Sequence, residues 1–470
     1  MNVFLVRKLI GSFALLGWLG VGDAAEIHVA TTDELVEAVE RAQKGDSILL
    51  AAGTYRLSSP LEPGSGVSII GKGIGQTVLT QEPDWQPSTQ TLPDPETRLK
   101  GMDTRAFLIR AVDKAVGISV SHLTLTGPKL HGAIYAFGNK QLHLHHLRVE
   151  DFLASGVRTH ALSESKIEEC EFVDAGGRWK RGGIPGTDGG ISGGAIFAVW
   201  TTDTEIAHNR FTRTQKGKAD GHYGIKGRQG KRCRIHHNTI EVNFSIEFPF
   251  EGDEDMEIDH NVCFGAISIP KYAGGKVPES GRTFHIHHNY MTAGYSIEFV
   301  RNGVEIDHNL FDFSAEKDGG NLISGFGKAA APGPALFHNN LVSNPGRGVI
   351  WINEPYDNLI VRNNHIIART TSTPRKEGLF GFNSKSDFKT YRIIDNIIEC
   401  RGLARPLFRN KESDAAMIEN NQLTNVSHVG RLSNQETGRL RGLEEPLAFD
   451  CGVHGELQVD GWKATRRTPE

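Results

Sequence analysis

The sequence predicts an all-β protein: a single-domain, right-handed parallel β-helix of about 12 coils with a short N-terminal capping helix. Three observations support this prediction. The motif apolar-x-His-Asn recurs at intervals of 20–39 residues. Each interval holds a second apolar segment with strand-like alternation, and no stretch between the two segments is long enough for a helix. Short helix-free repeats of this kind bury their apolar faces by stacking on one another.

The repeated motif is best explained as structure. Its full copies end at Asn209, Asn238, Asn261, Asn289 and Asn309, and degenerate copies end at Asn340, Asn364, Asn396 and Asn421. An Asn at such a turn tolerates a left-handed backbone and hydrogen-bonds its neighbour in a ladder. The preceding histidines form a second stacked row. His285-Ile286-His287-His288 resembles a metal-binding pattern, but five stacked copies favour a structural ladder, so we expect no metal and no cofactor.

The second apolar segments are predicted to be strands with Ile facing inward. Aligning them on that Ile predicts which side chains stack on the outer face. One outward row reads Tyr135, Arg158, Phe197, Lys226, Glu247, Ser268 and Glu298. Two residues further along the strands, the next row contains Phe137, His160, Val199 and Arg228.

The ends of the chain differ from the repeat. Arg7 and Lys8 precede an apolar run, which is typical of a secretory signal peptide over residues 1–25; an uncleaved anchor is the alternative. The β-helix with its cap is assigned to residues 26–426, where Thr31 is a good helix N-cap, and residues 427–470 to a C-terminal cap or tail. We therefore expect a periplasmic or secreted protein.

Composition limits the partners. Lys and Arg number 52 and Asp and Glu number 56, giving a net charge of −4, which argues against a bulk electrostatic nucleic-acid binder. The five cysteines contain no CxxC, and the odd count argues against a disulfide framework, so buried thiols are expected. We expect a monomer that does not bind a membrane after signal cleavage.

Cationic and aromatic residues cluster around one strand. His222, Lys226 and Arg228 share the outward parity, and Arg158 and His160 lie about two coils away, roughly 10 Å. Tyr135 and Phe197 add aromatic faces, and the large insertion at 174–193, with Trp179 and Arg181, emerges beside them. Such a patch suits an anionic sugar chain, because cations meet carboxylates and rings stack on pyranose faces. The alternative is that these are ordinary solvated surface residues.

Asp220-Gly-His-Tyr-Gly-Ile-Lys226-Gly, followed by Arg-Ile-His-His-Asn238, resembles the central coil of the parallel β-helix polysaccharide lyases, the chondroitinase B and alginate lyase group. The resemblance implies that Lys226 is the catalytic base. Glu247 stands where that group has an assisting Arg, and Ala219 and Gly221 stand where it has calcium carboxylates, so calcium is not supported. The chain is therefore more similar to a metal-independent branch that pairs Lys with Tyr, with Tyr223 and Tyr135 as candidates.

These residues predict a lyase that cleaves an alginate-like, uronic-acid-containing polysaccharide by β-elimination. Lys226 would take the C5 proton, Arg228 and Arg158 would neutralise the carboxylate, and Tyr223 or His222 would protonate the leaving oxygen. Glu247, one coil away, would oppose the required fall in the pKa of Lys226 unless it pairs with Arg228.

Three alternatives remain open at this point. A glycoside hydrolase would use Glu247 with Asp220 or Glu298 as the second carboxylate. A uronan C5-epimerase would begin with the same proton abstraction. A non-catalytic carbohydrate-binding or surface β-helix would need none of this chemistry.

Overall fold

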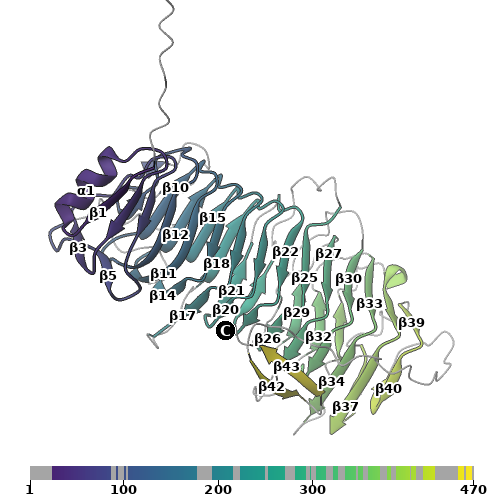
Figure 1. Cartoon of the computed structure of the whole chain (residues 1–470). Helices are drawn as coiled ribbons and strands as arrows, with labels where there is room; N and C mark the ends of the chain where they lie inside the picture. Colours follow the sequence, from purple (N-terminus) through teal and green to yellow (C-terminus); the bar gives the residue numbers. More distant parts are fainter. Residues whose placement is uncertain are drawn as a thin grey trace, which may run out of the picture.

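The structure is a computed structural model. The described residues are 24–85, 92–93, 100–101, 104–176, 193–214, 223–248, 252–269, 281–292, 297, 303–313, 321–325, 334–345, 348–352, 358–370, 378–382, 388–402, 404–408, 416–428, 454–459 and 462–467. The predicted signal peptide lies outside them except for its last two residues. Parallel strands stack along one long axis, as the fold prediction requires (Figure 1).

The N-terminal cap has the predicted form. Helix α1 (Thr32–Arg41) begins after Thr31, whose hydroxyl accepts a hydrogen bond from the Glu34 backbone N–H while the Glu34 carboxylate accepts one from the Thr31 N–H. Leu35, Ala38 and Val39 are buried against the first coil. The helix therefore covers the purple end of the stack in Figure 1, where open strand edges would otherwise invite association.

The first stack of parallel strands runs the length of the protein. Its members, in order, are β1 (Glu26–Val29), β2 (Ser47–Leu50), β4 (Ser68–Ile70), β9 (Ser119–Thr126), β11 (His143–Phe152), β13 (Lys166–Glu168), β16 (Glu205–Ala207), β19 (Arg234–His236), β22 (Met256–Asp259), β25 (Phe284–His287), β27 (Val304–Asp307), β30 (Ala335–His338), β33 (Leu359–Arg362), β36 (Arg392–Ile394) and β39 (Met417–Glu419).

The second stack follows the first around the coil and shares β9 and β11 with it. Its other members are β3 (Gly53–Leu57), β5 (Thr77–Gln81), β14 (Glu171–Ala175), β17 (Arg210–Thr212), β20 (Thr239–Ile240), β23 (Val262–Cys263), β26 (Tyr290–Met291), β28 (Leu310–Asp312), β31 (Leu341–Ser343), β34 (His365–Thr370), β37 (Ile397–Gly402) and β40 (Gln422–Thr424).

The third stack carries the predicted outward rows. It contains β8 (Phe107–Arg110), β10 (Gly132–Phe137), β12 (Ser155–His160), β15 (Gly194–Val199), β18 (Tyr223–Arg228), β21 (Phe244–Glu247) and β24 (Ala266–Ser268). Further along the chain β29 (Asn321–Gly325), β32 (Gly348–Ile352) and β35 (Phe380–Phe382) pair in the same way, as do β38 (Arg405–Pro406) and β41 (Val426–His428).

The remaining elements are small. The excursion after β5 contains the antiparallel pair β6 (Leu92–Pro93) and β7 (Lys100–Gly101), and the 3₁₀ turn η1 spans Phe388–Thr390. Near the C-terminus β42 (His454–Val459) and β43 (Trp462–Arg467) form an antiparallel hairpin. No helix among the described residues is long and apolar enough to cross a membrane.

The Asn ladder is confirmed, with one correction. Each Asn amide from Asn209 to Asn396 donates a hydrogen bond to the next Asn side chain at 2.9–3.1 Å. The left-handed backbone, however, lies at the preceding histidine, with φ of 51–57° at His208, His237, His260, His288 and His308. The Asn side chains are buried in the turn, while the imidazoles before them stack on one another.

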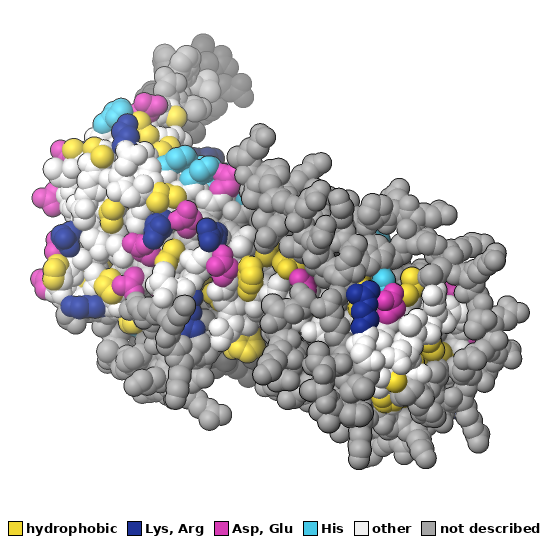
Figure 2. Space-filling view, turned by 90° about the horizontal axis from the view of Figure 1, so that it is seen from below, with side chains coloured by type: hydrophobic (Ala, Val, Ile, Leu, Met, Phe, Trp, Pro, Cys, Tyr) yellow, Lys and Arg dark blue, Asp and Glu magenta, His cyan; other side chains and the backbone are white. Residues whose placement is uncertain are grey.

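The interior is apolar and the surface is mixed in charge. The inward Ile row and its neighbours form one continuous core along the axis. Cys170, Cys233, Cys263 and Cys400 are buried free thiols, as expected, and Cys451 lies outside the described residues. Figure 2 shows Lys and Arg next to Asp and Glu on the face seen from below, consistent with the small net charge.

Candidate active site

Strand pairing in the third stack reproduces the first predicted outward row. Tyr135, Arg158, Phe197, Lys226, Glu247 and Ser268 are successive in-register partners on β10, β12, β15, β18, β21 and β24. The second row is also in register, through Phe137, His160, Val199 and Arg228. Arg158 and Lys226 are therefore two coils apart, with Phe197 between them.

Tyr223 lies on the same outer face as Lys226, although strict alternation would place it inward. The alternation breaks at Gly224 and Ile225, which both face the core: a Cβ on Gly224 would lie 2.6 Å from Ile240, and Ile225 is fully buried. The Lys226 ammonium consequently lies 4.0 Å from the centroid of the Tyr223 ring. This decides between the two candidate tyrosines by position, because Tyr135 lies three coils away along the row.

Gly227 shapes the strand between Lys226 and Arg228. It faces the core, and a Cβ there would lie 2.2 Å from the ring of Phe248, which is itself part of the core. The absence of a side chain at 227 lets Phe248 pack directly beneath the strand. Lys226 and Arg228 are thereby held on the opposite, outer face.

Lys226 forms an ion pair with Glu247, its in-register partner on β21. Burial lowers the pKa of Lys226 below that of an ordinary lysine. The Glu247 carboxylate opposes this fall, and Arg228 and Arg158 add to it. Glu247 therefore pairs with Lys226, which is the arrangement in which it opposes the fall in the pKa of that lysine. Burial also lowers the pKa of Arg228, and Glu247 raises it.

Arg158 and His160 flank this centre. The Arg158 guanidinium lies 4.4 Å from the centroid of the Phe197 ring, a cation–π contact. The His160 ring lies 6.0 Å from that of Tyr135 and 6.4 Å from that of Phe137. The predicted combination of cations with aromatic faces is thus present on one sheet.

The middle of the two outward rows is buried, and its members are not the solvated surface residues of the alternative interpretation. Arg158 and Lys226 are each 6% exposed, Phe197 is 1% and His160 is 3%. Phe197 is nonetheless outside the apolar core, so it is buried on the outer face of the sheet.

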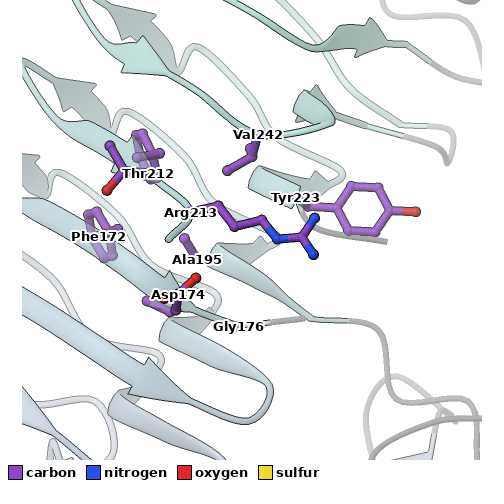
Figure 3. A pocket seen from close by; sticks show the side chains of 10 residues that line it. Phe172, Asp174, Gly176, Ala195, Thr212, Arg213, Tyr223 and Val242 are labelled. Atoms are coloured by element: carbon purple, nitrogen blue, oxygen red, sulfur yellow. The ribbon is translucent and has the colours of Figure 1, made fainter. Parts of the chain in front are cut away.

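A small pocket adjoins the site at the corner between the second and third stacks. Phe172, Phe211 and Tyr223 line it together with Asp174 and Arg213, and Figure 3 shows the Arg213 side chain reaching toward Tyr223. Sequence reasoning missed Asp174 and Arg213. They directly follow the paired residues Val173 and Thr212, so aligning the second-stack strands would have brought them together.

Several predicted residues lie outside the described part of the chain: Trp179, Arg181, His222, Asp220, Glu298, Ala219 and Gly221. Their predicted roles stay predictions. Groups that could hold a metal do occur on the first stack, at His208, His236 and His237, at Glu257, His285 and His287, and at His285, Glu305 and Asp307.

No protein-family model matches the chain, and no curated protein matches it in sequence. Solved structures resemble it in shape. The A-module of mannuronan C-5 epimerase AlgE6 from Azotobacter vinelandii aligns over 85% of this chain and 94% of its own, at 11% identity and a TM-score of 0.42. An alginate lyase from Paenibacillus sp. aligns over 87% and 98%, at 14% identity and a TM-score of 0.32.

The similarity is not confined to enzymes. The Streptococcus pneumoniae surface protein and adhesin PfbA aligns over 86% of this chain and 95% of its own, at 12% identity and a TM-score of 0.46. Likenesses of this degree select no activity. The function must therefore be argued from the side chains of the site.

Proposed function

We propose that this protein is an exported lyase that cleaves a uronic-acid-containing, alginate-like polysaccharide by β-elimination. The observation that carries the proposal is the Lys226 ammonium, whose pKa is lowered by burial, beside Tyr223 and on one face with Arg158 and Arg228. A lysine whose pKa is lowered is better suited to general-base chemistry than an ordinary lysine. Export itself remains a prediction from the N-terminal sequence.

The cations supply the electrostatic part of the reaction. Removing the C5 proton of a uronate places negative charge on the carbon next to the carboxylate, and guanidinium groups stabilise the charge that spreads onto that carboxylate. Arg228, two residues along the strand from Lys226, and Arg158, two coils away, are assigned this role. Phe197 between them contacts the Arg158 guanidinium through the cation–π contact and so positions it.

Lys226 and Tyr223 carry out the proton transfers of the proposed reaction. Lys226 first loses its proton to Glu247 or to solvent. The neutral amine then takes the C5 proton, the C4–C5 double bond forms, and the bond from C4 to the bridging oxygen breaks. The Tyr223 hydroxyl gives that oxygen its proton. No metal step is needed in this scheme.

The decisive experiment incubates a panel of uronic-acid polysaccharides with the wild type and with Lys226→Ala. Product is followed by the ultraviolet absorbance of unsaturated uronate and by chain length. We expect both signals from the wild type and at least a 100-fold loss in Lys226→Ala, the range for removing a general base. Lys231→Ala is the matched control, because Lys231 forms an exposed ion pair with Glu254. Equal activity of Lys226→Ala and the wild type would refute the assignment.

Glu247 supports a second candidate, a glycoside hydrolase, because its carboxylate lies on the same row with only 13% of its side chain exposed. Hydrolysis shortens the polymer without creating the unsaturated product. An epimerase would change neither absorbance nor length. The two readouts therefore separate a lyase from a hydrolase. An epimerase and a non-catalytic protein both give neither signal, and only the epimerase changes the uronate composition of the polymer.

A further inference from the structure

The outer face of the first stack is a lattice of histidines and charged side chains. One in-register row reads Glu205, Arg234, Glu257, His285 and Glu305, and the adjacent row reads His236, Asp259, His287, Asp307 and His338. Acidic and basic groups alternate along both rows. Stacked like charges at the interstrand spacing would repel, and alternation avoids this.

Most of this lattice is balanced by pairs between an acid and a base. The pairs are His236 with Glu205 at 2.7 Å, Arg234 with Asp259 at 2.7 Å, His287 with Glu257 at 3.0 Å, His285 with Asp307 at 2.6 Å and His338 with Glu305 at 2.9 Å. Two of the three groups with metal-ligand spacing consist of such residues. Their histidines and carboxylates already neutralise one another.

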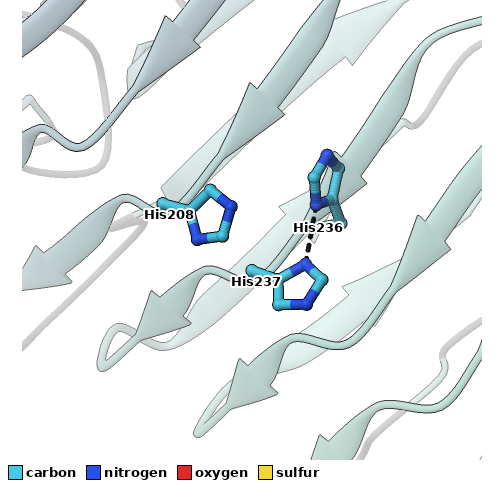
Figure 4. Close-up of side chains that lie close together, drawn as sticks. All are labelled: His208, His236 and His237. Atoms are coloured by element: carbon cyan, nitrogen blue, oxygen red, sulfur yellow. Dashed lines mark hydrogen bonds between the residues drawn. The ribbon is translucent and has the colours of Figure 1, made fainter. Parts of the chain in front are cut away.

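The third group is different because three imidazoles meet. Nδ1 of His236 lies 2.7 Å from Nδ1 of His237, and the ring of His208 stacks on that of His237 with 4.9 Å between centroids. One nitrogen from each ring falls within 4.8 Å of the others. Figure 4 shows the three rings on two successive coils of the first stack.

Glu205 prepares His236 to act as a ligand. Its Oε1 lies 2.7 Å from Nε2 of His236, so that nitrogen carries the proton and donates to the carboxylate. The Nδ1 lone pair of His236 is then directed at His237. A carboxylate that fixes the tautomer of a histidine in this way is the usual outer support of a metal-binding imidazole.

We propose that His208, His236 and His237 bind one divalent first-row transition-metal ion, with Zn²⁺ as the representative. Zn–N bonds of about 2.0–2.1 Å in a tetrahedral site require nitrogens about 3.3 Å apart, so the paired Nδ1 atoms need to separate only slightly. His208 is exposed and free to turn toward the ion. Three nitrogen donors favour such an ion over Mg²⁺ or Ca²⁺, which prefer oxygen.

Bound metal would tie the coil of β16 to the coil of β19. The fourth coordination position is left for water or an external ligand. The site lies on the first stack and Lys226 on the third, so this proposal is independent of the proposed lyase reaction.

The chain itself indicates suitable variants. Asn339, Asn363 and Asn420 occupy the same left-handed turn position in later coils, with φ of 53–55°, and each precedes a ladder Asn. His208→Asn and His237→Asn therefore remove an imidazole while keeping a residue that this turn accepts. His260→Asn is the matched control, because it changes the next rung, where the neighbour is Asp259 instead of a second His.

The experiment titrates the full chain, without a polyhistidine tag, with ZnCl₂ in a calorimeter, with MgCl₂ as the comparison ion. We expect the wild type and His260→Asn to bind one more equivalent of Zn²⁺ than His208→Asn and His237→Asn, or to bind it at least tenfold more tightly. We also expect Zn²⁺ to raise the Tm of the wild type and of His260→Asn, and not that of His208→Asn or His237→Asn. Melting without metal verifies that each variant is folded. Absence of Zn²⁺ binding by the wild type, or equal binding by all four proteins, would overturn the proposal.

Discussion

Lys226 and Glu247 form an ion pair across β18 and β21 in which only 7% and 13% of the two side chains are exposed. The pair places two opposed influences on one amine. Burial lowers the pKa of Lys226 and the adjacent carboxylate raises it. The protonation state of the proposed base therefore depends on Glu247. The β-helix lyases that the chain resembles have an arginine at this position.

Glu247→Gln should lower the pKa of Lys226 further, since the carboxylate that raises it is gone. The neutral amine then exists at lower pH, so the acid limb of the pH–rate profile for polysaccharide cleavage should move to lower pH. Initial rates of unsaturated uronate formation across pH measure this. Glu254→Gln, which breaks only the exposed pair with Lys231, should leave the profile in place. A shift to higher pH would contradict the role of Glu247.

The same pair should show strong coupling in stability. Lys226→Met and Glu247→Gln each leave one buried group without its partner and should lower the free energy of unfolding by about 3 kcal/mol. The double variant leaves no unpaired charge and should be less destabilised than the sum of the two. Urea unfolding of all four proteins gives the coupling energy. Strict additivity would show that the two side chains do not interact.

The register of the site was predictable because the inward positions carry a strong signal. Ile134, Val157, Ile196, Ile225 and Ile246 are successive core partners, and β pairing at fixed spacing then determines which outward residues stack. Lys226 next to Phe197 and Glu247 follows from that alignment alone.

Other features of the site could not be predicted from the spacing of residues in the sequence. Tyr223 reaches the outer face through a break in alternation, which results from Gly224 packing on Ile240. The ion pair between Lys226 and Glu247 depends on side-chain conformation. Strand periodicity places Arg158 and Lys226 on the outer face but does not report that each is only 6% exposed.

The buried Asn ladder makes a separate prediction. Asn289 is fully buried; its amide nitrogen, with two N–H donors, lies 2.9–3.0 Å from the carbonyl oxygens of Ile258 and His287 and from Oδ1 of Asn309, and its oxygen accepts from the backbone N–H of Asn261. Asn289→Ala leaves several buried backbone groups unsatisfied and should cost more than about 3 kcal/mol. Asn421→Ala, at the half-buried end of the ladder, should cost about 1 kcal/mol, because water can replace the amide there. Equal losses in chemical denaturation would show that burial does not determine the cost of losing an Asn from the ladder.

The histidine row should make the stability of the protein fall in mild acid. The pKa of His288 is lowered to about 4, from 6.5 for an unperturbed histidine. Burial is the largest cause, and the neighbouring imidazoles of His260, His287 and His308 add to it. Between these two values the unfolded chain binds a proton that the folded chain does not, so stability is lost as the pH falls from about 6.5 toward 4. His288→Asn removes this group while keeping a residue that the turn accepts at Asn339. The Tm of the wild type should therefore fall more than that of His288→Asn between pH 7 and pH 5. A constant difference between the two Tm values over that range would show that His288 does not titrate as the stacked arrangement requires.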